Sequence, residues 1–122
     1  MIDFFQRKLA ELDRAVAFLA NPRPVQSAPF DDSREVAGRL DDEWRQVRRF
    51  AVIYRAEAMV LVECIEAAAP RLGQPETLNH LMDQALAIVD RILPNVKEAH
   101  CCLTDEAGRH DLVFPPFNPA TL

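Results

Sequence analysis

Residues 36–68, VAGRLDDEWRQVRRFAVIYRAEAMVLVECIEAA, carry the strongest structural signal in this chain. From Leu40 onward, one set of their apolar residues recurs at alternating spacings of four and three. This is the period of one face of an α-helix. The run at residues 50–54 resembles a buried strand by itself, but the helical spacing continues through it without a break. The positions of this face are Val36, Leu40, Trp44, Val47, Ala51, Tyr54, Ala58, Leu61, Ile65 and Ala68. The pattern therefore predicts one helix through the whole stretch.

The expected ends of this helix follow from its flanking residues. Residues 32–35 form a helix-capping signature, with an aspartate followed three residues later by a glutamate. Residues 70–75 contain two prolines and a glycine, which predicts a turn. We therefore expect the helix over about residues 33–69. Gly38 and the acidic run 41–43 are the points where it is most prone to fray.

Two further helices are expected on either side. An apolar stripe predicts a first helix over about residues 3–20, and a connector with three prolines follows at residues 21–31. Pro75 suits the first position of a helix over about residues 75–107, and Pro94 within it predicts a kink. The first stripe is Phe5, Leu9, Leu12, Val16 and Leu19. The second is Leu78, Met82, Ala85, Val89, Ile92, Val96, Ala99 and Leu103.

The C-terminal region allows two interpretations. Gly108 is expected to close the helix in a left-handed conformation, followed by an extended, proline-rich tail over residues 108–122. The alternative is a β-hairpin over residues 101–114 with a glycine-containing turn. In either case the tail is too apolar to lie free in water, so Phe114 and Phe117 are expected to dock on the protein or on a partner.

Together these elements predict an all-α protein, with a long antiparallel helical hairpin, a shorter N-terminal helix and the extended tail. The second helix carries additional apolar lanes on its back, formed by Val52, Ala56 and Met59 and by Ile53 and Val60. A helix that is apolar nearly all round is expected to be buried on all sides. The simplest cover is a second copy of the chain, giving a two-fold dimeric bundle; the docked tail is the alternative.

Composition limits the classes of function. A chain of 122 residues is enough for one domain, and a net charge of −5 argues against a general nucleic-acid binder. The longest apolar runs span five residues, whereas a membrane-spanning helix needs about twenty. The N-terminus does not resemble a secretory signal, and the three cysteines do not suggest a disulfide framework. We therefore expect a cytoplasmic protein without a membrane contact.

One alternative is a metal or thiol-redox sensor built on His100, Cys101, Cys102 and His110. Thiolate and imidazole groups are the ligands that zinc and copper prefer. Adjacent cysteines on a helix point about 100° apart, however, and these residues lack the spacing of a known metal motif. Buried cysteine acting as a small apolar residue is the commoner case, so we expect no metal and no cofactor.

A second alternative is recognition of an anion or DNA by four arginines of the second helix, Arg45, Arg48, Arg49 and Arg55. Such a patch can hold phosphate. It can equally form ion pairs with nearby acidic residues or with those of a neighbouring chain.

No catalytic pattern is present, because the nucleophile, phosphate-loop and metalloprotease motifs are all missing from the sequence. The favoured hypothesis is therefore a non-enzymatic protein that acts by association, as a regulator, adaptor or assembly factor. The expected contact residues are Val52, Ala56, Met59, Phe114 and Phe117. The expected partners are a second copy of the chain and another protein. They would bind at these residues or in the groove that the first helix leaves uncovered.

Overall fold

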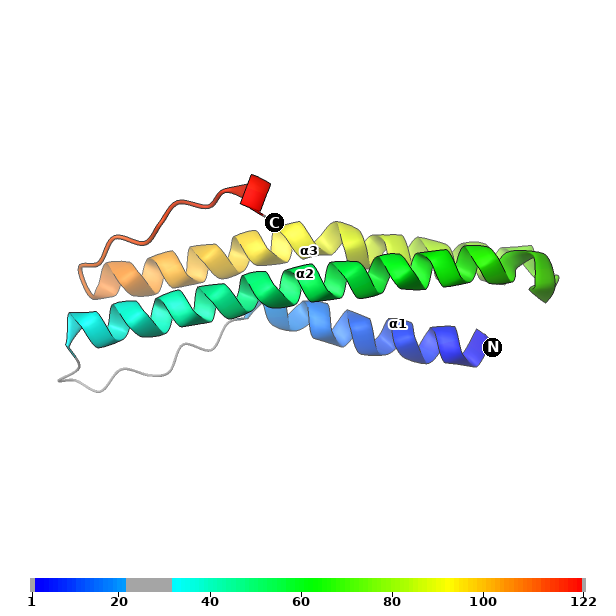
Figure 1. Ribbon diagram of the computed structural model, residues 1–122, viewed down its shortest axis with the longest axis horizontal. Helices are drawn as coiled ribbons and strands as arrows, with labels where there is room; N and C mark the ends of the chain where they lie inside the picture. Colours follow the sequence, from blue (N-terminus) through cyan, green and yellow to red (C-terminus); the bar gives the residue numbers. More distant parts are fainter. Residues whose placement is uncertain (1, 22–31, 122) are drawn as a thin grey trace.

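The computed structural model describes residues 2–21 and 32–121. Its elements are the helix α1 (Ile2–Ala17), the 3₁₀ turn η1 (Phe18–Ala20), the helices α2 (Ser33–Leu72) and α3 (Pro75–Arg109), and the 3₁₀ turn η2 (Pro119–Thr121). The molecule is elongated, with α2 and α3 side by side in opposite directions and α1 along part of their length (Figure 1). The described residues contain no strand, so the all-α prediction is confirmed. The connector predicted at residues 21–31 lies outside the described residues except for Asn21.

The long helix α2 is continuous over 40 residues, and neither Gly38 nor the acidic run interrupts it. It begins at Asp32, whose carboxylate accepts a hydrogen bond from the Arg34 backbone N–H at 3.2 Å, as the capping signature predicts. It ends at Leu72, three residues beyond the predicted end at about residue 69, and the exposed Pro70 in its last turn leaves the Glu66 carbonyl without a helical partner. Gly73, with φ 57°, closes the helix in the left-handed conformation that glycine adopts without strain.

The helix α3 begins with Pro75 in its first turn and continues to Arg109, so the β-hairpin alternative is wrong. Gly108 is helical and does not close it. The left-handed residue is instead Asp111, with φ 57°, and the Leu112 backbone N–H donates to the Ala107 carbonyl at 2.9 Å. This is a Schellman ending displaced by three residues from the glycine. Aspartate can occupy it because aspartate is among the few non-glycine residues that tolerate this conformation.

Pro94 lies within α3 and is exposed, on the polar side of the helix as its spacing predicts. The kink expected there stays a prediction.

The core follows the predicted stripes, with a wider face on α3 than the stripe alone indicates. On α2, Tyr54 is the stripe residue that is only partly buried. On α3, the stripe residues Met82 and Val89 are only partly buried, whereas their neighbours Leu81 and Ile88 are buried. The reason is that α3 packs against both α2 and α1 and therefore needs two adjacent apolar lanes. The buried apolar residues are Phe5, Leu9, Leu12, Val16, Leu19, Val36, Leu40, Trp44, Val47, Ala51, Ala58, Leu61, Val62, Ile65, Ala68, Leu78, Leu81, Ala85, Ile88, Ile92, Val96, Ala99, Leu103 and Ala107.

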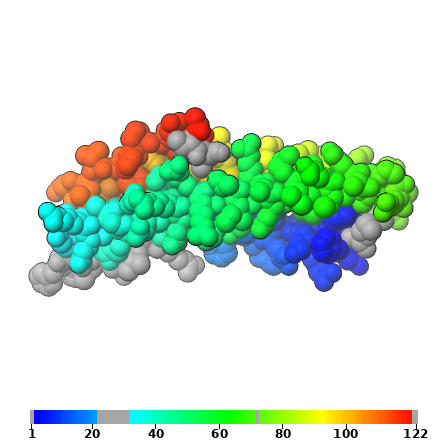
Figure 2. Space-filling view, viewed as in Figure 1, coloured from blue at the N-terminus to red at the C-terminus, as the bar shows by residue number. Residues whose placement is uncertain are grey.

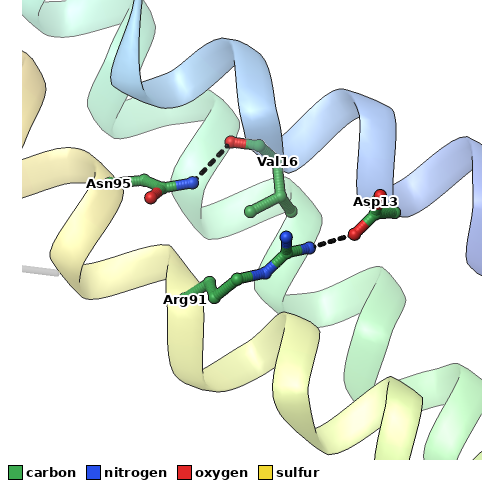
Figure 3. Close-up of polar contacts among 4 residues, drawn as sticks. All are labelled: Asp13, Val16, Arg91 and Asn95. Atoms are coloured by element: carbon green, nitrogen blue, oxygen red, sulfur yellow. Dashed lines mark hydrogen bonds and ion pairs between the residues drawn. The ribbon is translucent and has the colours of Figure 1, made fainter.

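Polar contacts fix α1 against α3 (Figure 3). Arg91 forms an ion pair with Asp13, and the Asn95 side-chain amide donates to the Val16 carbonyl at 3.0 Å. Val16 lies in the last turn of α1, where carbonyl groups lack helical partners. These contacts therefore complete the end of α1 and set its position along the bundle.

The C-terminal tail folds back along α3 (Figure 1). Phe117 lies 6.1 Å from Trp44 and Phe114 lies 5.3 Å from His100, measured between ring centroids. His100 Nε2 lies 2.6 Å from the Pro115 carbonyl oxygen. A carbonyl can only accept, so this nitrogen carries the proton and donates. Part of the tail therefore docks on its own chain. Within the described ranges, no helix combines the length and apolarity needed to cross a bilayer.

Candidate association surface

The outward side of α2 carries a group of apolar residues, which we call the outer face: Val52, Ile53, Ala56, Met59 and Val60. Ile53 is partly buried and the other four are exposed. Val52 and Val60 are each 56% exposed, and Met59 is 41% exposed. In Figure 2, α2 (cyan to green) extends along the front of the molecule, with α1 (blue) below it and the tail (red) above. Neither segment covers the middle of this helix in that view.

The exposure follows from helical geometry. A helix turns about 100° per residue, so Ala56 and Val60 lie on the side opposite the buried Ala58 and Ile65. The sequence predicts that these lanes are enclosed, but within the described residues of one chain they are not. The tail reaches only their edge, where Pro119 lines a depression with Val52 and Arg55. The alternative that the tail covers the outer face is therefore wrong for these residues.

A groove between α1 and α2 adjoins the outer face. It has a volume of about 630 Å³, and its walls are mainly apolar. The main contributors are Phe4, Leu12 and Ala15 from α1 and Ala56, Val60 and Cys64 from α2. Ala56 and Val60 thus belong to both surfaces, so the outer face and the groove form one continuous apolar region on this part of α2.

The four arginines do not converge on one point. Arg45 pairs with Asp41 at 3.0 Å within the same helix. Arg48 is half-buried, and its Nε has no hydrogen-bond partner among the described residues. Arg49 and Arg55 are exposed. Ten residues separate the first arginine from the last, which is about 15 Å along a helix, so the structure does not form a single anion cradle here.

The predicted metal candidates are likewise not brought together. His100 is buried, and its second ring nitrogen, Nδ1, lies 3.5 Å from Thr104 Oγ1, so both ring nitrogens have neighbours within the protein. Cys101 and Cys102 are exposed free thiols. The remaining candidate, His110, lies 3.4 Å from a Glu106 carboxylate oxygen. Across the described residues, no group of three or more histidine, cysteine and acidic side chains has metal-binding geometry.

Sequence reasoning missed the cluster formed by Trp44, His100, Phe114 and Phe117. The available signal was that His100 directly follows Ala99 on the predicted stripe, which places its ring at the edge of the core. Phe114 and Phe117, predicted as contact residues for a partner, are half-buried in this cluster. Their rings are used within the chain, so the outer face is the uncovered part of the predicted contact set.

No family model matches this chain, and comparisons with curated proteins and with solved structures give no match either.

Proposed function

We propose that this protein acts without catalysis, by association, and that a second copy of the chain occupies the outer face of α2. The observation that supports this is the exposure of Val52, Met59 and Val60 together on one side of a long helix. Full burial of an exposed side chain of this type gains roughly 1.5–3 kcal/mol, and these three, which are about half exposed, can each gain about half of that. A matching apolar surface on a second copy supplies that cover through a self-complementary, two-fold contact.

A role as a regulator, adaptor or assembly factor is consistent with this surface. The dimer would carry two copies of the groove between α1 and α2, and could therefore bind two partner molecules at once. The metal and anion hypotheses lack comparable support. Nε2 of His100 and one of the arginines are already engaged within the chain, whereas the outer face has no described cover.

The proposal is tested by measuring molar mass with light scattering across a concentration series. We expect about twice the protomer mass of 13.8 kDa. The variant Val60→Glu should be monomeric, because each dimer would bury two carboxylates in an apolar contact, which weakens the dimer by at least about 100-fold. The matched control is Val113→Glu, at a tail position that is 99% exposed; it should remain dimeric. A monomeric wild-type protein over the whole series would contradict the proposal.

A further inference from the structure

Exposed charged residues lie on both sides of the apolar centre of the outer face. Those at about equal distances before and after Ala56 have opposite signs. Between residues 42 and 71, the exposed charged residues within about 60° of Ala56 around the helix are Asp42, Arg45, Arg49, Glu63 and Arg71. Arg45 already pairs with Asp41 in its own chain. Arg49 and Glu63 lie seven residues before and after Ala56, and the outer two lie fourteen before and fifteen after it. All five lie on the same side of the helix as Ala56, at about 100° per residue, and the position that mirrors Arg45 about Ala56 is the uncharged Ala67. The surface is thus complementary in charge to its own reversed copy.

We infer that two copies pack α2 against α2 in antiparallel orientation, with the two-fold axis passing beside Ala56. This inference rests on the proposed function, since it specifies how the second copy is seated. In such a pair, residues equally far before and after Ala56 lie level with each other. Arg49 then lies level with the partner's Glu63, about 10 Å from the axis on either side, and the ion pair forms twice.

The apolar residues fit the same arrangement. Val52 lies along one edge of the contact beside the partner's Met59, and Ile53 lies along the other edge beside the partner's Val60. Ala56 meets the partner's Ala56 on the axis. A small side chain at that point allows the two helices to approach closely, because interaxial distance depends on the residues at the crossing.

Other arrangements bring like charges together. A parallel pair places Arg49 opposite the partner's Arg49 and Glu63 opposite the partner's Glu63. An antiparallel pair centred on Val60 places Arg49 level with the partner's Arg71. Like charges in direct opposition are unfavourable. Within the described residues, neither Arg49 nor Glu63 forms an ion pair inside its own chain, so both are available for this contact.

Charge reversal tests the register. Dimer dissociation constants are measured by analytical ultracentrifugation for Arg49→Glu, for Glu63→Arg and for the double variant. Each single variant replaces two attractive pairs by two repulsive pairs and should weaken the dimer about tenfold or more. The double variant restores attraction with the signs exchanged, and its dissociation constant should return to within about threefold of the wild-type value. Lys97→Glu and Glu98→Arg on exposed positions of α3 are matched controls and should change little.

The outcomes separate this inference from the proposed function. If the wild-type protein is dimeric and Val60→Glu dissociates it, while both single charge reversals leave it unchanged, then the register is wrong and the dimer stands. Weakening by both single variants without recovery in the double variant would also overturn the pairing. A monomeric wild-type protein would overturn both proposals.

Discussion

At the scale of single residues, His100 shows how the surroundings of a side chain decide its role. Its Nε2 donates to the Pro115 carbonyl, and its ring faces Trp44 at 5.1 Å between centroids. Thr104 Oγ1 donates to the His100 backbone carbonyl at 2.8 Å. The imidazole is therefore part of the contact that holds the tail on the helices. Its neighbouring cysteines are exposed and take no part in that contact.

The first prediction concerns this contact. Phe114→Ala removes a half-buried ring that faces both Trp44 and His100, and it should lower the free energy of unfolding by about 1–3 kcal/mol. The matched control is Val113→Ala, one residue earlier and almost fully exposed, which should change stability by less than about 0.5 kcal/mol. Urea unfolding followed by fluorescence measures both, since Trp44 is the one tryptophan in the sequence. Equal stability of the two variants would show that the tail is not held by this ring.

At the scale of elements, glycine has different effects at the C-terminal end of α2 and inside this helix. Gly73 ends the helix with a positive φ, a conformation that costs an L-residue roughly 1–2 kcal/mol. Gly38 lies inside the helix, and an added Cβ there would meet no atom within 4 Å. The same substitution should therefore have opposite effects at the two positions.

The second prediction is that Gly38→Ala raises the free energy of unfolding by about 0.5–1 kcal/mol, because alanine loses less backbone entropy in a helix. Gly73→Ala should lower it by about 1 kcal/mol. Thermal and urea unfolding of both variants, at one fixed protein concentration, provides the measurement. A stabilising Gly73→Ala would mean that the turn between α2 and α3 does not require the left-handed conformation.

The sequence predicted the elements because helical period is a local property that repeats many times along each helix. It failed where two local signals compete, as at the end of α3, where hydrogen bonds to Ala107 and Gly108 place the left-handed residue at Asp111 and not at the glycine. It also placed the end of α2 too early, because Pro70 was taken as the end of the helix, whereas the helix continues for two residues past it to Leu72.

The candidate surface was predictable in part for the same reason. The lanes containing Val52, Ala56 and Met59 can be derived from spacing alone. The groove beside them cannot, because it depends on where Phe4 of α1 lies relative to Val60 of α2. Likewise, spacing cannot place Phe117 on Trp44, since the tail has no periodicity and reaches the ring only through the three-dimensional path of the chain.

At the scale of the whole molecule, the proposed two-fold axis determines which surfaces come together. Along one chain, α1 and the tail lie on opposite sides of α2 (Figure 2). The two-fold axis runs across α2, from the side that carries α1 to the side that carries the tail. Rotation about this axis leaves that direction unchanged, so α1 of the second copy lies on the same side of the dimer as α1 of the first. The dimer would therefore carry both α1–α2 grooves on one face and both tails on the other.

The last prediction follows from mass action in that dimer. When the folded state is a dimer and the unfolded state is a single chain, stability rises with protein concentration. A hundredfold increase adds about 2.7 kcal/mol per dimer, which should raise the Tm by about 5 °C for a pair of chains of this length. Val60→Glu should unfold at a Tm that does not depend on concentration, because its folded state is a single chain. Scanning calorimetry on both proteins over the same concentration range decides the matter. A wild-type Tm that stays constant over this range would contradict the dimer, because it would show that the outer face of α2 contributes nothing to stability through a second copy.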